Sequence, residues 1–99
     1  MFEKWIGRHV VVRTYSAGVH IGTLAEIDTS AAGVSVTLTD ARRLWRWEGA
    51  FTLSEVATAG ITPKGSRIAA VVPEIIVTSV AELIPTTEAA RSTFDATHE

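Results

Sequence analysis

Arginine and tryptophan side chains are concentrated in one short stretch, residues 40–47, which we call the Arg-Trp segment. It reads Asp40-Ala41-Arg42-Arg43-Leu44-Trp45-Arg46-Trp47 and holds three of the nine basic residues and two of the three tryptophans. A guanidinium group offers paired planar donors to a phosphate or carboxylate, and an indole offers a flat face on which a base can stack. This combination is typical of a nucleotide pocket. The candidate ligand-binding residues are therefore Arg42, Arg43, Trp45, Arg46 and Trp47.

A structural interpretation of the Arg-Trp segment stays open. On a strand, side chains alternate between two faces, one carrying Arg43, Trp45 and Trp47 and the other Arg42, Leu44 and Arg46. One tryptophan could fill the core while Arg42 or Arg46 pairs with Asp40 or Glu48. Both tryptophans could instead anchor a subunit interface, where Trp and Arg are enriched.

Two residues from earlier in the chain join the candidate site. Tyr15 ends the first predicted strand beside a turn at residues 16–18, and His20 lies in the second predicted strand. Histidine titrates near neutral pH, so a ligand contact through His20 is feasible. If the turn meets the Arg-Trp segment of a neighbouring subunit, Tyr15 and His20 line the same pocket. The alternative is that both are ordinary surface residues.

The rest of the chain offers no recognisable catalytic or metal-binding pattern. There is no cysteine, and the three histidines are His9, His20 and His98. Asp28 and Asp40 flank the third predicted strand at opposite ends, too far apart to share an ion. No glycine-rich phosphate loop occurs. We expect a binding protein rather than an enzyme, without a catalytic centre, metal or cofactor.

The elements that must position these residues are short strands joined by tight turns. β-branched runs and alternating apolar positions predict strands over residues 10–15, 19–27, 34–39, 42–48, 67–72 and 74–84. Asp40-Ala41 is predicted to connect two strands, Pro73 to interrupt another, and Gly22 to mark a bulge or sharp bend. The predicted fold is mainly β, a small, strongly bent barrel of the Sm-like or SH3-like kind, with five to six strands and one or two short helices. An open sheet covered by the helices is the alternative.

Two helix signals follow the Arg-Trp segment. Thr52 and Glu55 form a capping box, and Gly60 ends a short helix inserted near residues 52–60. Thr86 or Thr87 could cap a second helix over residues 88–94. We therefore expect one barrel domain over residues 1–85, followed by a short C-terminal helix and a frayed tail over residues 86–99.

Composition narrows the possible partners. The chain has 99 residues, 46% of them hydrophobic and 20% charged, which is apolar for so small a domain and favours a homo-oligomer. Three acidic residues and one basic residue lie in residues 86–99, which leaves eight of each sign elsewhere. This balance argues against a protein that coats long nucleic acid. No apolar run approaches the roughly 20 residues that span a bilayer, and no signal peptide is evident, so we expect a cytosolic protein.

Nearly the whole chain resembles a family of small phage and prophage proteins of unknown function. The resemblance lies in Trp5-Ile6-Gly7, Val12–Val19, Leu38–Trp47, Leu53-Ser54 and Ala81–Pro85. It implies a viral origin, and therefore a location in the host cytoplasm, but no established activity.

The strand rhythm is also similar to that of Sm-like small barrels, which form rings and bind RNA or nucleotides. This similarity lies in Gly22-Thr23-Leu24, Val36–Ala41 and Val72–Val77. The chain departs from that pattern because it lacks a convincing N-terminal helix and carries a helical insert after the Arg-Trp segment.

A third resemblance suggests a function. Phages encode small β-rich oligomers that sequester nucleotide immune signals of the host, and this chain resembles them in size, implied origin and its Arg-Trp segment. We expect a non-enzymatic protein that sequesters a small anionic, nucleotide-like ligand between subunits. The alternatives are a protein–protein inhibitor or virion accessory protein with Trp45 and Trp47 as hot spots, and an Sm-like RNA-binding ring.

Overall fold

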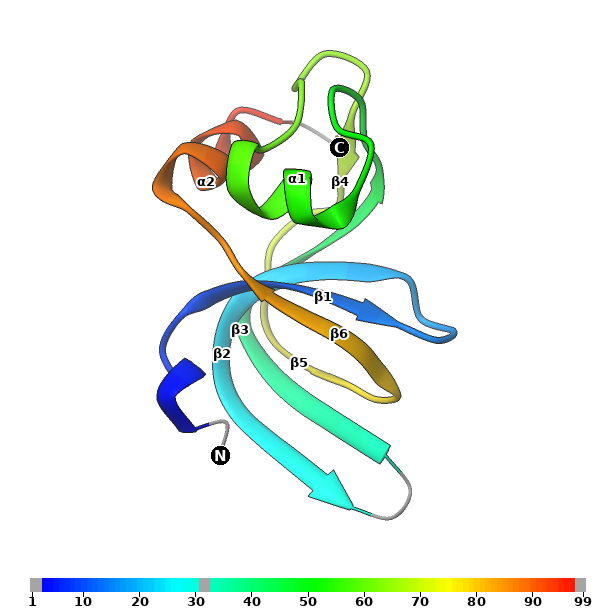
Figure 1. The fold of residues 1–99 in the computed structure, drawn as a ribbon, viewed down its shortest axis with the longest axis vertical. Helices are drawn as coiled ribbons and strands as arrows, with labels where there is room; N and C mark the ends of the chain where they lie inside the picture. Colours follow the sequence, from blue (N-terminus) through cyan, green and yellow to red (C-terminus); the bar gives the residue numbers. More distant parts are fainter. Residues whose placement is uncertain (1–2, 31–32, 98–99) are drawn as a thin grey trace.

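The computed structural model describes residues 3–30 and 33–97, which form one curled, half-barrel sheet with two short α-helices at one end (Figure 1). The elements are η1 (Glu3–Trp5), β1 (His9–Thr14), β2 (Val19–Ser30), β3 (Gly33–Arg46), α1 (Leu53–Ala59), β4 (Arg67–Ile68), β5 (Val72–Val77), β6 (Val80–Pro85) and α2 (Glu88–Asp95). The strand order is β4-β3-β2-β1-β6, β5 also pairs with β3, and every pairing is antiparallel. The six strands and two short α-helices confirm the predicted fold class, mainly β with five to six strands and one or two short helices.

A β-bulge bends the two longest strands. Asp40 and Ala41 of β3 together lie opposite the single residue Gly22 of β2. A Cβ atom at Gly22 would lie 3.1 Å from the Ala41 Cα and 3.1 Å from the Thr39 carbonyl oxygen, so the close approach of the two backbones favours glycine. The bulge predicted at Gly22 is confirmed.

The bulge lies where a connection between two strands was expected, at Asp40-Ala41. This connection is wrong, because β3 runs without a break from Gly33 to Arg46. Asp40 takes a φ of 49°, which is the left-handed conformation that aspartate tolerates better than most residues. Asp40, whose residue type indicates a turn, therefore lies at a bulge within a strand.

The last two predicted strands are also divided differently. The single strand predicted over residues 74–84 is wrong, because Thr78 and Ser79 separate β5 from β6 and Ser79 has a φ of 55°. Of the strand predicted over 67–72, Arg67–Ile68 pairs as β4 and Val72 begins β5, while residues 69–71 belong to neither strand. Pro73 does not interrupt a strand but lies within β5, an edge strand that pairs only with β3 in the described part of the chain. An edge position tolerates the missing N–H of proline.

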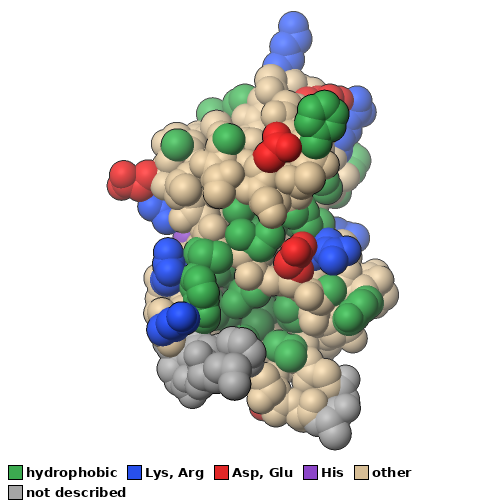
Figure 2. Space-filling model, viewed as in Figure 1, with side chains coloured by type: hydrophobic (Ala, Val, Ile, Leu, Met, Phe, Trp, Pro, Cys, Tyr) green, Lys and Arg blue, Asp and Glu red, His purple; other side chains and the backbone are tan. Residues whose placement is uncertain are grey.

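Two apolar clusters hold the fold together. The first joins the sheet to the helices and contains Val11, Ile21, Leu44, Val56, Ala57, Ile61, Ile68, Ala90 and Phe94. The second fills the curl of the sheet and contains Val10, Val12, Leu24, Val36, Leu38, Ala41 and Val77. Figure 2 shows apolar side chains reaching the surface across the middle of one face, below the helices. The curled sheet therefore leaves part of its apolar interior uncovered on that face.

Both helices begin at the predicted caps. The Thr52 hydroxyl accepts from the Glu55 amide at 3.2 Å, and the Thr87 hydroxyl accepts from the Ala90 amide at 3.1 Å. Beyond α2, Thr97 is buried. The frayed tail predicted at the end of the chain falls partly on residues 98–99, which lie outside the described residues.

Within residues 3–30 and 33–97, neither helix has the length and apolar character needed to cross a membrane.

Candidate functional site

Three of the seven predicted ligand-binding residues line one pocket at the edge of the sheet, which we call the edge pocket. His20, Arg42 and Arg43 lie around a cavity of about 190 Å³. The remaining wall is made of small or aliphatic side chains, Ala41, Ala69, Ala70, Val72 and Ile75. No acidic residue is among those lining residues, so the pocket carries net positive charge.

Arg43 lies over the turn that joins β1 to β2. Gly18 in this turn has a φ of 83°, and a Cβ atom there would lie only 2.9 Å from Nη2 of Arg43. Because Gly18 has no side chain, the Arg43 guanidinium can lie against this turn. Among the described residues, no ion pair or side-chain hydrogen bond engages this group, so its N–H donors are available to a ligand.

His20 forms the buried side of the edge pocket. Its Nε2 donates a hydrogen bond to the Ala17 carbonyl oxygen at 3.0 Å. Burial lowers the pKa of His20 and the neighbouring Arg43 lowers it further, while the hydrogen bond to Ala17 opposes both effects. The ring is therefore neutral at pH 7, and Nδ1 remains as a hydrogen-bond acceptor.

Arg42 has a structural role that differs from that of its neighbour. Its Nε donates to the Ala69 carbonyl oxygen at 2.8 Å, and Nη1 and Nη2 donate to the carbonyl oxygens of Phe94 and Thr97 at 3.2 and 3.3 Å. The Phe94 carbonyl lies in the last turn of α2, where the helix dipole favours a cation, and Thr97 follows the helix. Arg42 thus fastens α2 and the segment after β4 to the sheet.

The remaining four predicted residues lie elsewhere. Trp45 is 57% exposed, with the Arg67 guanidinium 6.0 Å from its ring centre. Arg46 is exposed, and its Nη2 lies 3.8 Å from Oε1 of Glu48, which agrees with the structural interpretation. Trp47 follows the end of β3 and packs against the first apolar cluster, so the predicted alternation does not extend to it. Tyr15 is 81% exposed. No tryptophan therefore lines the edge pocket.

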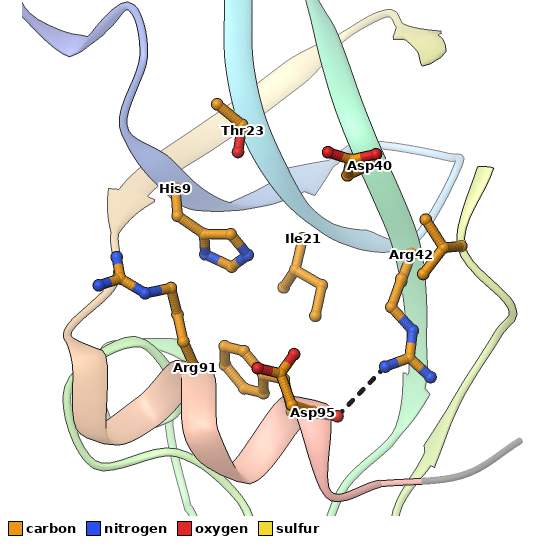
Figure 3. Close-up of a pocket in the computed structure, with 9 residues that line it drawn as sticks. His9, Ile21, Thr23, Asp40, Arg42, Arg91 and Asp95 are labelled. Carbon is orange, nitrogen blue, oxygen red and sulfur yellow. Dashed lines mark hydrogen bonds between the residues drawn. The ribbon is translucent and has the colours of Figure 1, made fainter. Parts of the chain in front are cut away.

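A second cavity lies between α2 and the sheet, and we call it the α2 cleft (Figure 3). It measures about 290 Å³ and is lined by His9, Ile21, Thr23, Asp40, Arg42, Val71, Arg91, Phe94 and Asp95. Arg42 is therefore common to both cavities. Two arginines and two aspartates face the α2 cleft, so its charges are balanced, unlike those of the edge pocket.

The His9 ring is held in place on two sides. Its Nδ1 lies 2.6 Å from Oγ1 of Thr86, and this hydroxyl donates to the His9 carbonyl oxygen at 3.1 Å. The ring stacks on Phe94 with the centroids 6.2 Å apart. Because the single hydroxyl hydrogen is used, Nδ1–H is the donor to Thr86 and Nε2 is the free acceptor. Burial and then Arg91 lower the pKa of His9, with Asp95 opposing them, so the ring is neutral at pH 7.

Sequence reasoning missed most residues of the α2 cleft. Arg91 and Asp95 are four residues apart on α2, and this spacing alone could have placed them on one helical face. Thr86 and His9 are separated by 77 positions, and no local pattern links them. Within the described ranges, no group of three or more His, Asp or Glu side chains is arranged to hold a metal ion.

The fold and the two cavities define a small, mainly β protein with pockets at the edge of its sheet and beneath its second helix. Comparison with known protein families shows which family the chain belongs to. Residues 7–94 match the family described as "Domain of unknown function (DUF6948)", and the chain belongs to this family. The predicted membership of a family of unknown function is thereby confirmed, but the match carries neither a phage origin nor a relation to Sm-like barrels. No curated protein and no solved structure matches the chain.

Proposed function

We propose that the chain is a non-catalytic protein that sequesters a small anionic, nucleotide-like ligand in the edge pocket. The observation that carries this proposal is the Arg43 guanidinium, which lies at a pocket without acidic residues and has no side-chain partner among the described residues. A phosphate or carboxylate can take two parallel hydrogen bonds from such a group. Nδ1 of His20 can accept a hydrogen bond from the same ligand.

The size of the edge pocket limits what one subunit can enclose. Pockets that bury a drug-sized ligand measure about 300–1,000 Å³, whereas the edge pocket measures about 190 Å³. It can therefore enclose only part of a nucleotide. Val72 at its rim and Ile76 further along β5 are exposed by 41% and 67%. In the proposal, these side chains contact a second copy of the chain, whose surface covers the rest of the ligand.

The biological setting of the proposal comes from the resemblance to phage proteins. On that basis, the ligand is a nucleotide immune signal of the host, and the protein acts in the host cytoplasm. A sequestering protein needs tight binding without turnover, which an arginine, a neutral histidine and apolar walls can supply without catalytic groups.

Calorimetric titration of the full chain tests the proposal. The panel contains AMP, ADP-ribose and cyclic dinucleotides, and the variants are Arg43→Gln and Arg46→Gln. Both arginines lie on β3 and are exposed, but only Arg43 lines the edge pocket. We expect Arg43→Gln to weaken binding at least tenfold, which is about 1.4 kcal/mol, and Arg46→Gln to leave it unchanged. Absence of binding across the panel, or equal losses in both variants, would contradict the proposal.

A second candidate function is protein–protein interaction through Trp45. The observation that favours it is the exposed indole with the Arg67 guanidinium above its face, because Trp and Arg are the residues most enriched at interface hot spots. Trp47 does not share this role, since it packs against the core. If Trp45→Ala abolishes capture of a partner while nucleotide binding is absent, this second function replaces the first. RNA binding by a ring stays a prediction without a specific observation in its favour.

A further inference from the structure

The α2 cleft places opposite charges on facing walls. Figure 3 shows Arg91 on one side of the cleft and Asp40 on the other, with His9 and Ile21 between them. Asp95 projects into the same space from α2. Among the described residues, no ion pair engages Arg91, Asp40 or Asp95. The cleft therefore holds one free cation and two free carboxylates that do not neutralise one another through direct contact.

The position of Asp40 is unusual for its residue type. It is one of two non-glycine residues with positive φ among the described residues, and it lies in the bulge opposite Gly22. Glycine takes this conformation without steric cost, and a bulge commonly redirects a side chain next to a functional site. The bulge therefore directs the Asp40 carboxylate into the cleft, and the left-handed backbone there costs some strain. No hydrogen bond or ion pair within the described residues accounts for its position.

The floor of the cleft is apolar and fixed. Ile21 and Phe94 are both buried at 2% exposure and belong to the first apolar cluster. Arg42 fastens the backbone of Phe94 to β3, and His9 stacks on the Phe94 ring. The neutral His9 ring offers Nε2 as an acceptor beside this floor. The charged residues of the cleft thus surround a rigid apolar floor.

From these features we propose that the α2 cleft binds a small zwitterion, namely an α-amino acid with an apolar side chain. Its carboxylate binds Arg91, and its ammonium group lies toward Asp40, Asp95 and Nε2 of His9, where the two carboxylates favour a cation. Its side chain lies beside Val71, the apolar residue of the cleft wall that is 55% exposed. A cavity of about 290 Å³ suits a single amino acid and is too small for a peptide. This site is separate from the edge pocket and does not depend on the function proposed for it.

Two-dimensional amide NMR of the full chain, titrated with three compounds, tests the inference. L-Leucine carries both charges, N-acetyl-L-leucine lacks the ammonium group, and L-leucinamide lacks the carboxylate. We expect leucine to shift the amides of residues 9, 40 and 91–95, and each blocked compound to bind at least about tenfold more weakly. No shift at these positions up to about 10 mM leucine, or equal binding of all three compounds, would overturn the proposal.

Substitutions in the cleft test which residue binds the carboxylate and which binds the ammonium group. Arg91→Gln should remove the difference between leucine and leucinamide, and Asp40→Asn should reduce the difference between leucine and N-acetyl-leucine. The matched control is Arg43→Gln, which lies outside the α2 cleft and should leave leucine binding unchanged. A loss in Arg43→Gln equal to that in Arg91→Gln would overturn the assignment to the α2 cleft. If a variant does not fold, the comparison of the three compounds on the unaltered chain still decides the question.

Discussion

The edge pocket and the α2 cleft differ in charge although they share Arg42 as a wall. The edge pocket holds the uncompensated cation of Arg43, whereas the α2 cleft sets two arginines against two aspartates. The difference originates in two consecutive residues of one strand. Arg42 has three carbonyl partners and Arg43 has no side-chain partner among the described residues. Identical side chains thus become a structural clamp or a free donor according to what the fold places around them.

The largest expected effect tests whether α2 is docked firmly enough to form its cleft. Phe94→Ala should lower the free energy of unfolding by about 3–5 kcal/mol, because it leaves a cavity in the first apolar cluster. Phe51→Ala is the matched control, since Phe51 is 96% exposed, and should change it by less than about 0.5 kcal/mol. Urea unfolding followed by circular dichroism measures both. A loss below about 1 kcal/mol for Phe94→Ala would mean that α2 does not close the cleft.

The next effect separates the two arginines directly. Arg42→Gln should lower the free energy of unfolding by about 2–3 kcal/mol, because three buried or half-buried carbonyls lose a charged donor. Arg43→Gln should change it by no more than about 0.5 kcal/mol, as expected for an exposed side chain without such contacts. The same urea experiment applies. Equal losses in the two variants would remove the distinction between clamp and free donor.

A smaller effect sharpens the account of how Arg43 is placed. Gly7 and Gly18 both have positive φ, but only a Cβ at Gly18 would touch the Arg43 side chain. Alanine at either position should cost about 1–2 kcal/mol of stability through backbone strain. Only Gly18→Ala should also weaken binding of the anionic ligand in calorimetry. Equal ligand affinity in Gly7→Ala and Gly18→Ala would show that the turn does not position the guanidinium.

The smallest effect is a pH dependence shared by both cavities. His9 and His20 have pKa values below the ordinary 6.5, chiefly because burial disfavours the charged ring. The unfolded chain therefore binds these protons more readily, and stability present above pH 6.5 is lost as the pH falls below it. Thermal unfolding between pH 7.5 and 5.5 should show a declining Tm. His9→Gln and His20→Gln should each flatten this decline, and an unchanged slope in both would refute the neutral-ring assignment.

Local signals explain why much of the fold could be predicted. Alternating apolar residues located the strands, Thr52 and Gly60 marked the ends of α1, and Gly22 marked the bulge. Each of these depends on neighbours in the chain. A residue that favours turns can take a left-handed conformation either within a strand or between two strands. This explains both the turn wrongly predicted at Asp40-Ala41 and the break between strands missed at Ser79.

The candidate site was less predictable. His20, Arg42 and Arg43 are brought to one pocket. Trp47 is half-buried against the first apolar cluster instead, because β3 ends one residue before it. A sequence pattern gives the face of a strand only as far as the strand continues. It does not give the point at which neighbouring elements stop the pairing.

By itself, the sequence determined a mainly β chain with two capped helices and a segment rich in arginine and tryptophan. These properties follow from periodicity and from hydrogen bonds between residues a few positions apart. Only the tertiary structure decided which arginine is free, where the carboxylate of Asp40 points, and that His9 meets Thr86 across 77 positions. Such contacts depend on how distant segments pack, and the charges that define the two cavities come together only when they do.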